Sequence, residues 1–125
     1  MIHEDRYRTY LQALVAGRRA ECFALVQEEL DQGAAVRDVY THLFQRSLYD
    51  IGEMWERRKV SVAVEHLATS ITESLFGLVY PRLFGGNRAG RTAVIACVAN
   101  EFHQIGGKMV ADIMELCPNA HVLNY

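Results

Sequence analysis

A histidine in a polar loop is the first place in this chain where chemistry can be expected. The segment Glu101–Gly107 directly follows the apolar run Ala93–Val98 and contains His103, with Glu101 two residues before it. In open α/β sheets, ligands bind in the loops at the carboxyl ends of the strands. A carboxylate that accepts the second ring N–H of an imidazole fixes its tautomer and raises its basicity, as in many metal sites. The sequence therefore places His103, with Glu101 as its partner, in a loop where a ligand can bind.

Two glycines follow this histidine at the start of the next expected helix. Gly106 and Gly107 carry no side chains, so a flat ligand can approach the backbone there. We count Gln104, which lies between His103 and these glycines, among the expected ligand contacts. The alternative is a strand–turn–helix in which the histidine is merely solvated.

A second group of candidate residues lies upstream. Trp55 is followed, after nine intervening residues, by Glu65 and His66. Trp55 lies near the end of one expected helix and the pair near the start of the next, so they can converge across an antiparallel helix turn. Each also has an ordinary structural explanation: aromatic side chains dominate core burial, and a glutamate in a first helical turn complements the helix dipole.

Together these two patterns resemble a known family. E-x-H-x-x-G resembles the cobalt-ligating signature of base-off, His-on cobalamin-binding domains. W-x9-E-H resembles a signature in the helical cap of cobalamin-dependent photoreceptors and related regulators. Both occur in the family's order, and the resemblance covers about Tyr7 to about Leu116. It implies that His103 ligates cobalt from below the corrin ring, while Trp55 and Glu65 meet a 5′-deoxyadenosyl group above it. It also implies that His66 approaches cobalt when the alkyl group is absent.

The resemblance implies a sensory or regulatory module and not an enzyme. The implied cofactor is a cobalamin, with its cobalt, in the adenosylcobalamin or methylcobalamin form. The resemblance also implies that light or a ligand changes the state of the module and that this change is passed to a regulatory protein partner. One alternative is a corrinoid carrier protein of a methyltransferase system. Trp55, Glu65 and His66 favour the sensor, because a methyl carrier has only a small upper ligand to cover. A second alternative is a helical interaction module that binds no cofactor.

Composition limits the class of protein. The chain has 125 residues, half of them hydrophobic, which is enough for a real core. Its net charge of −2, without a long basic run, gives no reason to expect direct nucleic-acid binding. No segment is long and apolar enough to span a membrane, and the N-terminus does not read as a signal peptide. Three widely spaced cysteines are typical of reduced thiols, so we expect a cytoplasmic protein.

Apolar residues recur at helical spacing through the first two thirds of the chain. Gly33 is in position to end the second helix, and Ser61 to cap the fourth. Short connections favour antiparallel neighbours, hence a four-helix-bundle cap over residues 1–84. The spacing predicts helices over 7–15, 19–30, 35–56 and 61–80.

After residue 84 the composition changes. Residues 85–91 have the glycine content and charge of a linker. Residues 92–98 are apolar throughout, which predicts a strand of a parallel sheet covered by helices on both faces. Residues 107–116 return to helical spacing, and 121–125 can begin a second strand. The fold class is thus mainly α: the cap is followed, over 92–125, by the first strand–loop–helix of a doubly wound, Rossmann-like α/β domain.

The predicted strand has no complete sheet around it in this chain. A strand needs neighbours to satisfy its backbone groups, and exposed apolar edges recruit other strands. We therefore expect the chain to be a homo-oligomer in which residues 93–98 or the helix after His103 lie in the contact.

Overall fold

The computed structural model of the chain describes residues 1–83, 90–101, 103–117 and 120–124. The chain divides into two compact units, Met1–Leu78 and Val79–Tyr125. We call the first the cap unit and the second the strand unit. Most of the linker expected at 85–91 lies outside the described residues. The boundaries 1–84, 85–91 and 92–125 stay a prediction.

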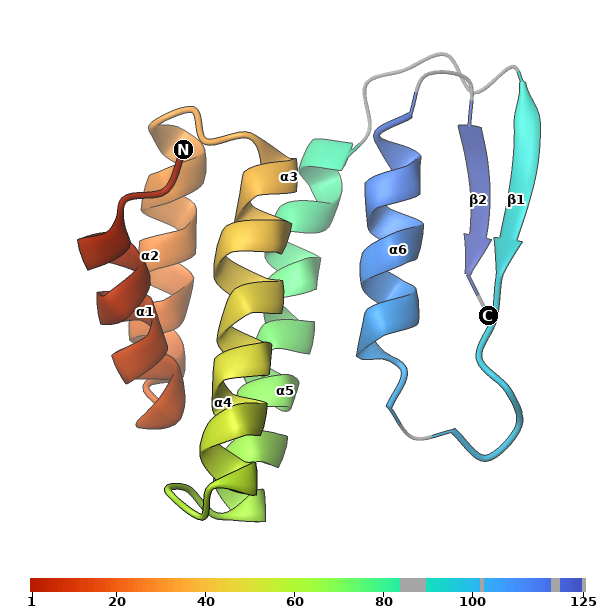
Figure 1. Cartoon of the computed structure of the whole chain (residues 1–125). Coiled ribbons are helices and arrows are strands. Elements are labelled where there is room, and N and C mark those ends of the chain that lie inside the picture. The colour runs from red at the N-terminus through yellow and green to blue at the C-terminus, as the bar shows by residue number, and fades with distance from the viewer. Residues whose placement is uncertain (84–89, 102, 118–119, 125) are drawn as a thin grey trace. The chain divides into compact units, whose positions relative to one another are not determined.

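The cap unit consists of four helical segments (Figure 1). The third is one unbroken helical run whose middle part, η1, has π-helical hydrogen bonding, a local widening that apolar spacing does not reveal. The predicted four helices are confirmed. Their elements are α1 (Glu4–Val15), α2 (Arg19–Asp31), α3 (Val36–Asp38) with η1 (Val39–Gln45) and α4 (Arg46–Glu56), and α5 (Val62–Val79).

Helix ends follow from the local sequence. Gly33 takes a φ of 88° just after α2, where a side chain would be strained. There the Ala34 N–H donates to the Glu29 carbonyl at 2.9 Å and closes the helix end. Ser61 caps α5, because its Oγ accepts the Val64 N–H at 3.4 Å. Both predicted helix ends are confirmed.

Aromatic rings from three helices fill the middle of the cap unit. The Tyr40 ring stacks on Phe76 with centroids 5.3 Å apart and meets Phe44 edge-on at 5.3 Å. Tyr10 packs against Phe44 from α1, with centroids 6.4 Å apart. Burial of this area supplies most of the stabilisation of such a bundle. The fully buried aliphatic residues around the rings include Leu14, Val26, Leu43, Ile51, Ile71 and Leu75.

A polar cluster joins α1 to the third helical run. The Tyr7 hydroxyl donates to Asp50, and the Arg46 guanidinium lies 3.7 Å above the centre of the Tyr7 ring. Arg46 also donates to both oxygens of Glu4, at 2.9 and 3.0 Å. Burial and the Asp50 bond raise the pKa of Tyr7, and the Arg46 bond lowers the pKa of the Glu4 carboxyl.

The strand unit is a parallel β–α–β arrangement. Strands β1 (Arg91–Ile95) and β2 (Ala120–Asn124) pair in parallel from Arg91 with Ala120 to Ile95 with Asn124. Helix α6 (Ile105–Glu115) connects them (Figure 1), as parallel strands require a crossover. A short 3-10 helix, η2 (Tyr80–Leu83), precedes them. The predicted second strand and the predicted fold class, mainly α with the beginning of an α/β domain, are confirmed.

The sheet differs from the prediction in its burial. Ile95 and Cys97 point toward α6, whereas Val94 is 63% and Val98 78% exposed. The expectation that both faces of this strand are covered is wrong for the described residues. Period-two alternation decides which side chains share a face, but a neighbouring element decides whether that face is buried. Here α6 covers one face of the sheet.

None of the described helices is long and apolar enough to cross a membrane.

Candidate functional site

Trp55 lies in the last turn of α4 with half of its surface exposed. The helix ends in a tight turn in which Arg58 takes a φ of 59°. The Arg58 N–H donates to the Trp55 carbonyl at 2.9 Å, and the Lys59 N–H donates to the Met54 carbonyl at 2.8 Å. Trp55 is therefore held by its backbone at a defined end of the bundle. Its exposure distinguishes it from the fully buried aromatic residues of the core.

Glu65 and His66 lie near the start of α5 and contact each other. His66 Nδ1 is 2.7 Å from one carboxylate oxygen of Glu65, and the Thr69 hydroxyl donates to the other at 3.4 Å. Glu65 is half-buried and His66 exposed. The carboxylate is thus held from both sides, and the Nε2 side of the imidazole is turned away from it. The sequence interpretation missed Thr69, although the spacing of four residues on a helix indicates such a contact.

The end of the bundle that carries these residues is apolar as well as polar. Val62 and Leu67 on α5 are exposed, as is Trp55 on α4. The turn between α1 and α2 packs against the same part of α5: a Cβ on Gly17 would lie 2.7 Å from Leu67 Cδ2. Exposed apolar side chains grouped at one end of a helical bundle are typical of a contact surface.

In the strand unit, Glu101 and His103 also contact each other. Glu101 Oε1 accepts the backbone N–H of His103 at 2.7 Å and lies 3.2 Å from its ring Nδ1. The His103 side chain is 80% exposed. With Nδ1 protonated and donating to the carboxylate, Nε2 keeps the lone pair that a metal ligand needs.

The remaining candidates in this loop have distinct surroundings. Gln104 donates from Nε2 to the Glu101 carbonyl at 3.1 Å, a contact within the loop. A Cβ on Gly106 would meet nothing within 4 Å, so its surface is open. A Cβ on Gly107 would lie 3.2 Å from Cys97 Sγ. Gly107 therefore allows α6 to approach the strand closely, and Gly106 is the glycine with free space beside it.

These residues fit the metal that the resemblance implies. A corrin would supply most of the donors to its cobalt, so one protein donor would be sufficient, and imidazole suits a borderline metal. Among the described residues, no three His, Cys, Asp or Glu side chains gather as a metal-binding group. A single exposed imidazole with a carboxylate on its Nδ1 is a donor set suited to a metal that arrives in a macrocycle.

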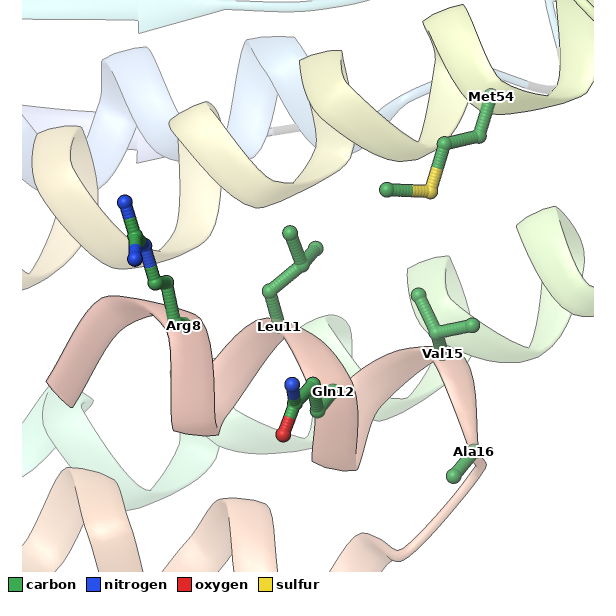
Figure 2. A pocket seen from close by; sticks show the side chains of 6 residues that line it. All are labelled: Arg8, Leu11, Gln12, Val15, Ala16 and Met54. Atoms are coloured by element: carbon green, nitrogen blue, oxygen red, sulfur yellow. The ribbon is translucent and has the colours of Figure 1, made fainter. Parts of the chain in front are cut away.

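The cap unit also has an apolar groove of about 440 Å³ that no motif indicated. Figure 2 shows Leu11 and Met54 projecting into it, with the Arg8 guanidinium at one end. Consecutive side chains of a helix point about 100° apart, so the groove beside Met54 opens on another side of α4 than Trp55. Its lining is Arg8, Leu11, Gln12, Val15, Ala16 and Met54.

Comparison with known proteins agrees with the family that the sequence resembles. The HTH-type transcriptional repressor CarH of Myxococcus xanthus is 28% identical over 102 residues, which are 78% of this chain and 33% of the repressor. The chain therefore spans about a third of the length of that relative. A family profile described as the B12 binding domain matches residues 7–80, a range that includes Trp55, Glu65 and His66. Because this match covers more than half of its residues, the chain belongs to the B12 binding domain family.

Proposed function

We propose that the chain is a regulatory cobalamin-binding module in which Trp55, Glu65 and His66 of the cap unit and the His103 loop of the strand unit both contribute to corrinoid binding. The observation that carries the proposal is the pairing of His103 Nδ1 with Glu101, 3.2 Å apart. It supports an imidazole in the tautomer that presents Nε2 as a ligand. Membership of the B12 binding domain family supports the choice of cofactor.

The residues would divide the work in this proposal. The corrinoid would supply a cobalt ion, His103 Nε2 would donate to it, and Glu101 would keep the proton on Nδ1. Gly106, with open space around its Cα, would give room for the ring, and Gln104 keeps the Glu101 carbonyl in place. Trp55 would shield the ligand on the other side of the ring from water, and Glu65 would accept hydrogen bonds from it. His66 would approach the cobalt when no alkyl group is bound.

We further propose that the module regulates a partner and catalyses no reaction. The similarity to a transcriptional repressor supports a role in regulation. A light- or ligand-driven change at the upper axial position would alter the Trp55 end of the bundle, and a homo-oligomer or another regulatory protein would respond. An upper ligand as large as adenosyl suits the exposed Trp55 better than methyl does, so adenosylcobalamin is the preferred cofactor over methylcobalamin.

Absorption spectroscopy tests ligation directly. Addition of adenosylcobalamin or methylcobalamin in the dark should give a base-off, His-on spectrum with the wild-type chain. His103→Ala should lose it, whereas His42→Ala, which removes an exposed histidine from the cap unit, should keep it. Absence of any spectral change or corrinoid retention in the wild type would contradict the proposal and favour a cofactor-free interaction module.

A second experiment tests the upper face. Trp55→Ala should weaken adenosylcobalamin binding more than hydroxocobalamin binding and leave helical content intact, because Trp55 is half exposed. Tyr49→Ala, which removes another exposed aromatic residue of α4, should affect neither. Equal loss for both cobalamins with a collapsed melting temperature would make Trp55 a core residue. Equal binding of methyl and adenosyl forms by the wild type would favour a methyl carrier.

A further inference from the structure

The loop that carries His103 begins with a tight turn. The Glu101 N–H donates to the Val98 carbonyl at 3.1 Å, which closes a four-residue turn over Ala99 and Asn100. Asn100, third in the turn, has a φ of 67°. A positive φ in the third position is the type II pattern, which selects Gly or Asn, because other side chains clash with the backbone there.

This turn sets the direction in which the next residues leave the strand. Glu101 is the last residue of the turn, and its carboxylate accepts the His103 backbone N–H at 2.7 Å and lies 3.2 Å from Nδ1. Its carbonyl accepts the Gln104 amide at 3.1 Å. All three contacts depend on how the turn orients Glu101. None of these three contacts involves a side-chain atom of Asn100.

We propose that Asn100 is a positioning residue for His103: its left-handed backbone turns Glu101 so that the carboxylate selects the Nδ1–H tautomer and leaves Nε2 for the axial metal. The assignment of Nε2 to cobalt rests on the function proposed above. The selection of the tautomer does not, since it is a property of the chain without cofactor.

Nuclear magnetic resonance of the cofactor-free chain tests the proposal. Long-range nitrogen–proton spectra of ¹⁵N-labelled protein report which ring nitrogen of His103 carries the proton. The wild type and Asn100→Gly should both show the Nδ1–H form, because glycine adopts a positive φ without cost. Asn100→Val should lower the ratio of the Nδ1–H form of His103 to the Nε2–H form roughly tenfold. This is the effect of a left-handed conformation forced on a branched residue.

Arg58→Val is the matched control. Arg58 also has a positive φ, 59°, but it lies in the turn after α4. Its replacement should disturb the cap unit and leave the His103 tautomer unchanged. If Asn100→Val unfolds the strand unit, seen as loss of the amide signals of β1 and α6, Asn100→Ala takes its place with the same expected direction.

Two results would overturn the proposal. One is an unchanged tautomer in the folded Val or Ala variant, and the other is an equal loss in Asn100→Gly. A wild-type chain that shows the Nδ1–H form but binds no cobalamin would contradict the proposed function and leave the role of Asn100 standing. The reverse result, a His-on spectrum that is insensitive to Asn100→Val, would leave the function standing and remove Asn100 from it.

Discussion

The cap unit and the strand unit each hold a histidine by its Nδ1 against a carboxylate, yet they do so by different means. His66 is beside Glu65 on a helix whose next turns bury one face, with Ala68 and Ile71, in the bundle, and the His66 Nδ1 and the Glu65 carboxylate oxygen are 2.7 Å apart. His103 is on a loop, where Glu101 binds both its backbone N–H and its ring. The first pair depends on a packed core, and the second depends on hydrogen bonds within a few residues.

The difference extends to the surroundings of each pair. The cap unit buries whole aromatic and aliphatic side chains, whereas the described part of the strand unit leaves one face of its sheet open, with Val94 and Val98 exposed. A two-stranded sheet with one helix is a small core for independent stability. Changes in the cap unit should therefore act on the fold, and changes in the strand unit on assembly and on the local loop.

The largest expected effect is on the cap core. Phe44→Ala removes a fully buried ring that contacts Tyr10, Tyr40 and Phe76. It should lower the free energy of unfolding by about 3–5 kcal/mol, measured by chemical denaturation followed by circular dichroism. Val94→Thr in the open sheet face is the comparison and should change stability little. Similar losses for the two variants would contradict the contrast between the units.

Assembly should respond to the strand unit. We expect wild-type light-scattering masses of at least twice the 14.2 kDa of one chain, because exposed apolar side chains such as Val94 and Val98 favour contact with another chain. Val94→Lys combined with Val98→Lys should return the mass to that of one chain. Tyr49→Lys, on an exposed position of the cap unit, should not. A wild-type mass of 14.2 kDa with β1 ordered would contradict this prediction.

Two tyrosines of α1 sharpen the description of the cap core. The Tyr7 hydroxyl donates to Asp50, so Tyr7→Phe should lower stability by about 1–3 kcal/mol. The Tyr10 hydroxyl is buried without a hydrogen-bond partner among the described residues. The nearby hydroxyls of Ser47 and Thr72 donate to carbonyls of their own helices, at 3.0 and 2.9 Å. Both oxygens can still accept a hydrogen bond from Tyr10, so Tyr10→Phe should change stability by less than about 1 kcal/mol, less than Tyr7→Phe does. A loss as large as that of Tyr7→Phe in thermal or chemical denaturation would show that the Tyr10 hydroxyl makes a full hydrogen bond.

The last effect, which is seen only at alkaline pH, is a pH dependence in the cap unit. Burial raises the pKa of the Cys22 thiol from 9.0 to about 11. Between these values the unfolded chain has lost the proton that the folded chain keeps, so stability is complete below about pH 9 and falls as the pH rises. This one thiol contributes at most about 1.4 kcal/mol per pH unit to the slope of the unfolding free energy against pH. Cys22→Ala should reduce this slope in denaturation series from pH 8 to 11, whereas Cys117→Ala, at an exposed thiol, should not. An unchanged slope in Cys22→Ala would contradict the assignment.

Much of the fold was predictable because it depends on local rules. Apolar residues at helical spacing give four helices wherever such stripes can face one another, and Gly33 and Ser61 end or begin helices through backbone conformation and one hydrogen bond. The family was predictable because the spacing of Trp55, Glu65 and His66, which lie within the matched range, is a property of the sequence alone. Glu101 and His103 lie outside the matched range, and their roles stay a prediction.

What the tertiary structure decided is what lies next to each residue. Gly106 and Gly107 are identical neighbours in the sequence, but only Gly107 packs against Cys97 of the strand side. Val94 and Ile95 are equally apolar, yet one is exposed because α6 covers the other face of the sheet. The spacing of residues decides which face of a helix or strand they share. Whether that face is buried depends on neighbours that are distant in the chain, and no local pattern contains this information.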